Sequence, residues 1–460
     1  MKTIVRYIFH VIAALSAAGL ASCADNKFGG DVDGGGLDGL DRMLLVLHIT
    51  PVDTEPVMTN AEVREMIGSL RIILLSDGII ECNKLVEFNG PGPFAASQFK
   101  YDFTWKTFAG KKSFYIIANE GSVTDGLQFR LPDGDEGFLP DVPESLTELL
   151  DSYEAVGKEG LGNAAAESSC AELERVLKSI CFEPDYTAKN GDLYLPYVSY
   201  YSADDVEALN IRKGDFLGEE APYTLYLVPV ATKFTFNFTN YRPNDVEINN
   251  ITVSSANGAS FLMARVGKDD YTKLYGTSDD KNTWLPYYWI DWLARVSEAS
   301  HQNEDFDNNQ NFNTKYGWIS NYDIPAGDTP APHVFIDAGT SRKVDKAVKT
   351  GAAGEEEDGT PGTLTLNSYY LPESRNIDTE TGRQAYYITL GLHDVTQKDE
   401  DDPKFENQPI QNLNALFRNT RVIINVVMRQ GNVRVYAEIA KWSEKSANGW
   451  VVEGPEPPEP

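Results

Sequence analysis

Apolar runs separated by turn residues recur along the first third of this chain, and they predict strands. Residues 43–49 (MLLVLHI) form a nearly continuous apolar run, which is typical of a strand buried on both faces. Residues 70–75 (LRIILL) predict a second strand, and Asp77-Gly78 supplies a hairpin turn after it. Residues 113–120 (SFYIIANE) predict a third strand.

The hydrophobic pattern becomes helical between residues 143 and 182. Residues 143–156 (PESLTELLDSYEAV) open with a Pro and acids, as helices commonly do. Residues 167–182 (ESSCAELERVLKSICF) carry Leu173, Val176, Leu177 and Ile180 on one face and predict a single amphipathic helix. We therefore expect a helical insert within a β-rich fold.

Strand patterns resume in the second half of the chain. In residues 233–240 (KFTFNFTN), phenylalanines alternate with polar residues, which predicts a half-buried strand. Residues 245–255 (DVEINNITVSS) continue this style, with Asn249-Asn250 as a bulge. Residues 421–442 predict a hairpin with Gly431 in its turn. One face of its second strand is expected to carry Val433, Val435, Ala437 and Ile439.

These elements predict a mostly β protein with two β-rich domains in series, each a sandwich, the first with the helical insert. Gly, acidic residues and Pro cluster near residues 215–223, so we place the boundary there. The predicted domains are residues 43–222 and 223–453. A Pro- and Glu-rich tail, residues 454–460, follows the second domain.

The first 42 residues have the composition of an export signal and a tether. Residues 1–22 begin with Lys2 and Arg6 and continue into a short apolar run, as secretory signal peptides do. The following Leu-Ala-Ser-Cys, ending at Cys23, resembles a bacterial lipobox, which implies cleavage before Cys23 and acylation of its thiol. Several acyl chains anchor a protein stably in a membrane. Residues 23–42 are rich in Gly and Asp and predict a flexible tether.

Composition and charge exclude some functions. The chain has 460 residues, with 40 basic against 69 acidic residues and a net charge of −29. Such a field repels phosphates, so we expect no nucleic-acid partner. No hydrolase, phosphate-loop or zinc-protease motif is present, and the histidines are scattered. We therefore expect no enzyme, no metal site and no cofactor. The cysteines after Cys23 do not have metal-ligand spacing and are expected to be buried.

Short motifs behind the lipobox resemble those of Bacteroidales fimbrillins. They occur in the family's order across most of the chain: IGSLRIILLSDG, FYIIANE, YLVPVATKFTFNFTN, YYLPES, and a last hairpin opened by RNT and closed by KW. Pro229 and Thr232 depart from the family's interdomain strand, and Tyr197 replaces a family-typical Met. The resemblance implies two transthyretin-like β-sandwich domains. It also implies a fimbrial subunit exported as a lipoprotein to the surface of the outer membrane and supporting cell adhesion.

In stalk subunits of this family a protease cuts after Arg or Lys and releases the first strand, and a neighbouring subunit's strand fills the groove. The resemblance therefore implies other fimbrial subunits as partners. A cut after Arg64 would free the first predicted strand. Alternatively, this strand stays permanently, as in an anchor subunit that keeps its lipid. The candidate exchanged strand comprises Met43, Leu44, Leu45, Val46, Leu47, His48 and Ile49.

Residues 283–323 concentrate four of the chain's seven tryptophans. Trp284, Tyr287, Tyr288 and Trp318 stand beside Asn and Asp, a combination that binds glycans or host proteins. A ligand surface here would indicate a surface-binding lipoprotein or tip adhesin. Helical spacing of Trp289, Trp292 and Val296 instead favours a helix packed on the sandwich. The sequence leaves both interpretations open.

Overall fold

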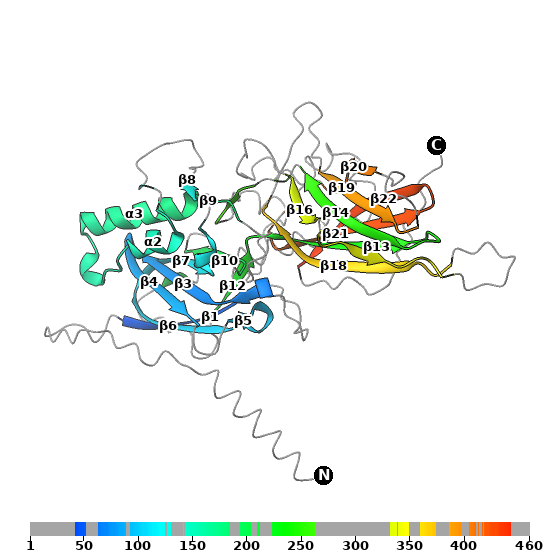
Figure 1. Ribbon diagram of the computed structural model, residues 1–460. Coiled ribbons are helices and arrows are strands. Elements are labelled where there is room, and N and C mark those ends of the chain that lie inside the picture. Colours follow the sequence, from blue (N-terminus) through cyan, green and yellow to red (C-terminus); the bar gives the residue numbers. More distant parts are fainter. Residues whose placement is uncertain are drawn as a thin grey trace, which may run out of the picture.

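The computed structural model shows two β-rich regions, the first of which carries helices (Figure 1). The N-terminal region comprises the elements from β1 (Arg42–Pro51) to β12 (Tyr223–Pro229). The C-terminal region comprises those from β13 (Thr232–Asn240) onward, apart from the short strand β15 (Ser260–Phe261). The structure describes residues 42–51, 63–88, 93–124, 127–129, 141, 143–184, 194–203, 209–211, 223–254, 256, 258–263, 332–337, 339–348, 359–373, 386–396, 404–410, 413, 416 and 418–442.

One large sheet dominates the N-terminal region, in the order β4-β3-β7-β10-β12-β1-β6, with β11 (Asn210–Ile211) paired to β7. Its end strands contact each other, since Thr107 Oγ1 on β6 donates to Glu81 Oε2 on β4 at 3.0 Å. The sheet therefore folds over into two layers. Its strands are β1 (Arg42–Pro51), β3 (Ser69–Ser76), β4 (Ile79–Glu87), β6 (Tyr101–Phe108), β7 (Gly110–Ala118), β10 (Tyr197–Ser202) and β12 (Tyr223–Pro229).

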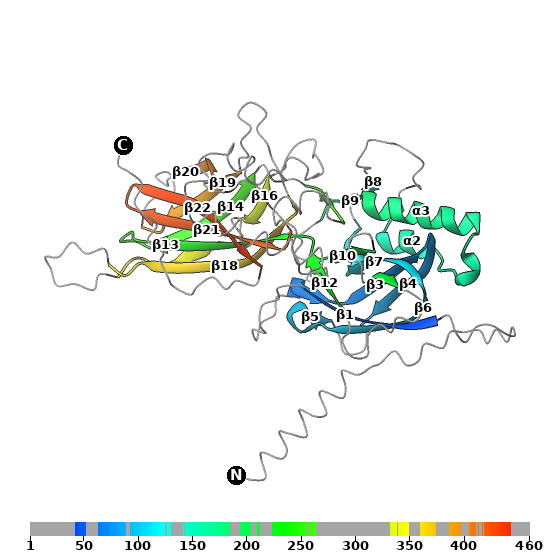
Figure 2. The ribbon, with the colours of Figure 1, turned by 180° about the vertical axis from the view of Figure 1, so that it is seen from behind.

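Strand β3 is buried on both faces because a layer covers each side of it. Leu70, Ile72 and Leu74 lie in the core shared with β1 and β12. Ile73 and Leu75 point the other way, into a second core with the helices α2 (Leu146–Asp151) and α3 (Ala164–Ser179). The helices lie across the sheet from β1 and β6 (Figures 1 and 2). The apolar pattern of residues 70–75 therefore reflects two different cores.

The predicted hairpin turn and helical insert are present, but both helices have different bounds. Asp77 and Gly78 both adopt positive φ, 44° and 86°, as a tight hairpin turn requires. Helix α2 begins only after Ser145, whose side chain accepts from the Glu148 amide and caps it. The prediction of one helix over residues 167–182 was wrong at its end, since α3 stops at Ser179. Cys181 belongs to strand β9 (Ile180–Phe182).

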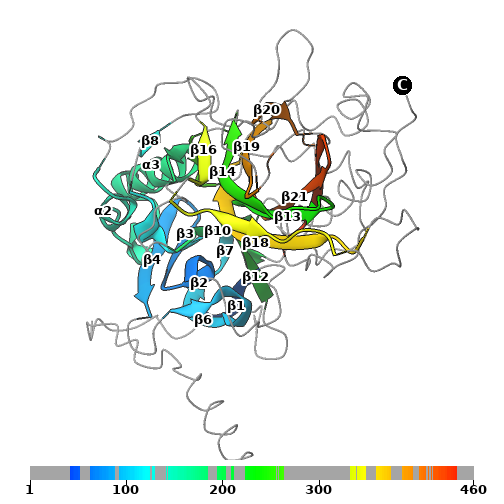
Figure 3. The same ribbon diagram turned by 45° about the vertical axis from the view of Figure 1, so that its right-hand side comes forward.

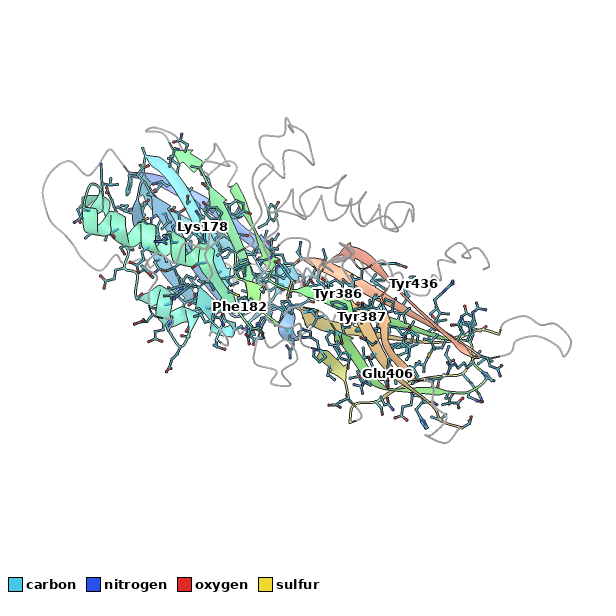
Figure 4. All side chains as sticks on the ribbon, turned by 90° about the horizontal axis from the view of Figure 1, so that it is seen from above. Lys178, Phe182, Tyr386, Tyr387, Glu406 and Tyr436 are labelled. Atoms are coloured by element: carbon cyan, nitrogen blue, oxygen red, sulfur yellow. The ribbon has the colours of Figure 1, made fainter. Side chains whose placement is uncertain are left out.

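The C-terminal region is a sandwich of two sheets with one apolar core between them. One sheet has the order β18-β13-β21-β22, and the other β16-β14-β19-β20 with β17 paired to β14. Figure 4 shows Tyr386, Tyr387, Glu406 and Tyr436 on this region, apart from Lys178 and Phe182 on the helical region. Its strands are β13 (Thr232–Asn240), β14 (Val246–Ser254), β16 (His333–Ile336), β17 (Arg342–Val344), β18 (Gly362–Leu371), β19 (Tyr387–Asp394), β20 (Lys404–Pro409), β21 (Thr420–Arg429) and β22 (Asn432–Lys441).

Details of the predicted strands mostly hold in this region. The register of β14 against β19 shifts between Ile248 and Asn250, which confirms the predicted bulge. Strands β21 and β22 form the predicted hairpin, with Gly431 at φ 77°. Strand β13 is not simply half-buried, because Thr235 is buried as completely as its phenylalanine neighbours. Its hydroxyl accepts from Arg421 Nε at 2.9 Å, so a charged residue covers the polar face.

The sequence places residues 223–229 at the start of the second domain, but strand pairing places them in the N-terminal sheet. Strand β12 runs parallel to β1 and antiparallel to β10, so it completes the N-terminal sheet. The chain enters the C-terminal region only at β13, after Val230 and Ala231. A small sheet of β8 (Gln128–Phe129), β9 and β15 (Ser260–Phe261) adds a second link, since β15 follows β14 in sequence but pairs with β9.

Candidate functional site

Strand β1 lies inside its sheet, between β6 and β12 (Figure 3). It pairs antiparallel with β6 from Arg42 to Ile49, and parallel with β12 from Leu47 to Pro51. Backbone groups on both of its sides are therefore occupied over Leu47–Ile49. Every other described element follows β1 along the chain.

One face of β1 provides the apolar contacts, and the other is only half-buried. Leu45, Leu47 and Ile49 are completely buried in the core shared with β3, β7, β10 and β12. Val46 and His48 on the opposite face are half-buried, so the prediction of burial on both faces was wrong. Among the described residues, neither Val46 nor His48 belongs to an apolar core, whereas β3 contributes side chains to two cores. Burying each of the three aliphatic chains contributes about 1.5–3 kcal/mol.

Polar contacts of β1 are fewer and more exposed. His48 Nδ1 lies against Asp102 Oδ1 on β6, with the two side chains 43% and 59% exposed. Exposed pairs of this kind contribute at most about 1 kcal/mol. Thr50 Oγ1 donates to the Phe99 carbonyl at 3.0 Å. The apolar face therefore contributes more to the binding of β1 than its polar contacts do.

Arg64 lies in a single 3₁₀ turn, η1 (Val63–Glu65), directly before the short strand β2 (Met66–Ile67). Its side chain is half-buried, and its carbonyl accepts from the Leu195 amide at 2.8 Å. Glu65 Oε1 accepts from Lys233 Nζ at 2.7 Å and from the Tyr370 hydroxyl at 2.8 Å. The candidate processing site is thus fastened to strands of the C-terminal region.

The partners of Glu65 form an aromatic-lined junction between the two regions. The Tyr370 and Trp442 rings stack with centroids 5.9 Å apart, and Lys233 Nζ lies 5.6 Å from the Trp442 ring centre. Tyr370 and Trp442 belong to the same apolar core as Leu47, although they come from the C-terminal region. The junction therefore borders the core that β1 completes.

The motifs singled out in the sequence meet at this junction. Asn119, the end of FYIIANE, donates to the carbonyls of Met66 and Leu195 at 2.8 and 2.7 Å. Glu373 of YYLPES pairs with Arg418 of the RNT motif. Arg418 also donates to the carbonyls at the end of the small sheet, Phe261 (2.6 Å) and Leu262 (2.8 Å). These residues therefore hold together parts of the chain that are far apart in sequence.

A buried charged cluster in the N-terminal region was missed at the sequence level. Lys112 Nζ donates to Glu81 Oε2 at 2.9 Å and to Ser76 Oγ at 2.7 Å, and it lies 4.2 Å from the Phe108 ring centre. Burial, partly offset by Glu81, holds the pKa of Lys112 below its ordinary value. The only signal for the cluster is a Lys and a Glu inside strand-like runs. It ties β4, β6 and β7 together at the fold of the sheet.

Cys82, Cys170 and Cys181 are all buried, as predicted. Burial raises the pKa of Cys82 to about 12 and that of Cys170 to about 11.

The residues predicted for lipidation and for the ligand surface lie outside the described residues: Cys23, Trp284, Tyr287, Tyr288 and Trp318. Among the residues that are described, no group of three or more His, Cys, Asp or Glu side chains is placed to hold a metal ion. None of the described helices has the length and apolar character needed to cross a membrane.

No protein-family model matches the sequence, and no curated protein matches it either. Solved structures do resemble the fold. They include fimbrial proteins and putative cell adhesion proteins of Bacteroidales. The tip fimbrial protein Mfa3 of Porphyromonas gingivalis aligns at 11% identity and a TM-score of 0.39, covering 87% of this chain and 100% of that one. A fimbrial assembly protein of Parabacteroides distasonis aligns at 10% identity and 0.37, covering 87% and 98%. A fimbrilin of P. gingivalis aligns at 12% and 0.36, covering 87% and 98%.

Proposed function

We propose that this protein is a non-catalytic fimbrial subunit that is exported as a lipoprotein through Cys23 and assembled by exchange of strand β1. Its two regions would then act as two transthyretin-like sandwich domains. In this proposal a protease cuts after Arg64, β1 leaves with its lipid, and a strand of a neighbouring subunit takes its place. The outer membrane and other fimbrial subunits are its partners.

The position of β1 is the observation that carries this proposal. A first strand that lies inside its sheet can leave without moving any later element. Its departure would leave unpaired backbone groups on β6 and β12. It would also expose the apolar core that had packed against Leu45, Leu47 and Ile49. Such an edge accepts a strand from another chain. Contacts of this type are heterologous and do not close, so they build a fibre.

Trypsin treatment of purified protein that begins at Ala24 tests the proposal, because trypsin cuts after Arg and Lys. We expect loss of a fragment that ends at Arg64, followed by a ladder of oligomers in size-exclusion chromatography. A synthetic peptide of residues 42–51 should suppress the ladder by filling the groove, and the same peptide with Leu47→Asp should not. Protein that is cut at Arg64 and remains monomeric without peptide would refute strand exchange.

The N-terminal sequence of the protein taken from cells separates the two roles left open above. A chain that begins at Glu65 indicates a stalk subunit. A blocked chain that begins at acylated Cys23 indicates an anchor subunit, in which β1 stays in its sheet.

A further inference from the structure

The chain on the C-terminal side of Arg64 is fastened residue by residue. The Arg64 carbonyl accepts from Leu195, Glu65 binds Lys233 and Tyr370, and the Met66 carbonyl accepts from Asn119. Ile67 pairs with Phe94 on β5 (Phe94–Ala95). The Gly68 amide donates to Asn119 Oδ1 at 2.8 Å. Five consecutive residues are therefore held in place.

The strongest of these contacts comes from the C-terminal region. The side chains of Lys233 and Glu65 are only 3% and 15% exposed, so their ion pair is largely withdrawn from water. Charge-assisted hydrogen bonds are about twice as strong as neutral ones. Tyr370 shares the same carboxylate oxygen, and its ring is fixed by stacking on Trp442. Strands β13 and β18 thereby hold Glu65 from outside the sheet that contains β1.

A protease needs this segment in a different state. Hydrolysis breaks the C–N bond between Arg64 and Glu65, and water supplies a hydroxyl to the Arg64 carbonyl carbon and a proton to the Glu65 nitrogen. During attack the Arg64 carbonyl oxygen has to accept hydrogen bonds from the protease. Here that oxygen is bound to Leu195, and Arg64 lies in a helical turn rather than in an extended loop. Proteases cut exposed, mobile loops far more readily than such segments.

Resting on the processing step in the proposed function, we propose that the Glu65–Lys233–Tyr370 contact is a lock that keeps the Arg64–Glu65 bond closed to proteases. The C-terminal region supplies the lock. Release of β1 therefore requires Glu65 to separate from β13 and β18, and strand exchange is delayed until the junction opens.

The rate of cleavage at Arg64 measures this lock, because cleavage follows the population of the open state when opening is fast. Lys233→Met and Tyr370→Phe remove the lock contacts and leave the sequence around the scissile bond unchanged. We expect each substitution to speed release of the fragment ending at Arg64 by about tenfold. Mass spectrometry at a fixed trypsin concentration measures the rate of release. Lys343→Met is the matched control, because Lys343 forms a more exposed pair with Asp245 elsewhere in the C-terminal region. It should be cut at the wild-type rate.

Two further measurements separate the lock from general unfolding. Alkylation of Cys170, which lies in the helical core, should be equally slow in wild type and both variants. Should Lys233→Met fail to fold, Tyr370→Phe still tests the lock, since it keeps the ring and its stacking on Trp442. A synthetic peptide of residues 58–70 gives the cleavage rate of the unlocked sequence.

Unchanged cleavage at Arg64 in the folded variants overturns the lock, and so does wild-type cleavage as fast as that of the free peptide. Faster cleavage accompanied by faster Cys170 alkylation also overturns it, because the whole region then unfolds. If the variants are cut faster but the products stay monomeric, the lock stands and strand exchange fails.

Discussion

The two regions bury their central strands in different ways. In the C-terminal region the interior strands β13, β14, β19 and β21 each lie between other strands along the chain, within the part that the structure describes. Removing any of them would break the chain on both sides. In the N-terminal region an interior position is held by β1, which precedes every other described element. One cut after it breaks its only covalent link to the later described elements.

Both regions bury charged side chains, but in different places. In the C-terminal region one apolar core fills the sandwich, and the buried Arg418–Glu373 pair binds the end of the small sheet. The N-terminal region places Lys112 and Glu81 in its interior, and Arg71 binds Glu120 and Asp151 across to the helices. These contacts connect β3, β4, β6 and β7 without any contribution from β1. The N-terminal region therefore has connections between its other strands that do not depend on β1.

Removal of β1 is expected to have the largest effect and to separate the two N-terminal cores. In protein that begins at Glu65, Cys82 should react with a thiol reagent more than about tenfold faster, because it shares a core with Leu45, Leu47 and Ile49. Cys170 shares its core with the helices and should remain protected. Equal reactivity of the two thiols, fast or slow, would contradict this separation.

Leu47→Ala should destabilise the N-terminal region by about 2–5 kcal/mol, since it leaves a cavity where a completely buried side chain had been. Denaturant unfolding followed by Cys82 alkylation measures the loss. Val46→Ala, on the half-buried face of the same strand, is the matched control and should cost less than about 1 kcal/mol. Equal losses at the two positions would mean that β1 does not bind through one face.

Alkaline pH should weaken the N-terminal region first, because all cysteines after Cys23 belong to it. Between pH 9 and about 11 to 12 the folded state keeps the protons of Cys170 and Cys82, whose pKa values burial raises, while the unfolded state loses them. The unfolded state then binds fewer protons, so stability falls as pH rises, by up to about 1.4 kcal/mol per pH unit for each thiol. Cys82→Ala/Cys170→Ala protein should lack this slope below pH 10, where tyrosines begin to titrate.

Local patterns in the sequence predict much of the fold. Asp77-Gly78, Asn249 and Gly431 mark a turn, a bulge and a hairpin that the structure contains. The predictions of burial fail where a residue that is distant in sequence packs over a strand face. Residues 43–49 and 70–75 have the same apolar character, yet among the described residues β3 contributes to two cores and β1 to one. Likewise, the burial of Thr235 depends on Arg421 from another strand.

The candidate site shows the same limit. The sequence points to β1 and Arg64 as individual features, because composition and a basic residue can be read locally. The lock on Glu65 depends on Lys233 and Tyr370, which are far away along the chain and have no motif relating them to Arg64. The parallel pairing of β1 with β12 also could not be predicted from local sequence patterns. This pairing places the boundary between the two regions after Pro229.

That parallel pairing has a kinetic consequence. Leu47 pairs with Tyr223, so β1 cannot complete its backbone hydrogen bonds until nearly half of the chain has been synthesised and has folded together. Contacts between such distant residues form slowly, and a sheet that is waiting for its strand exposes an apolar edge meanwhile. Strand β1, the first described strand along the chain, is therefore placed late, and the folding chain passes through a state in which the position between β6 and β12 is open.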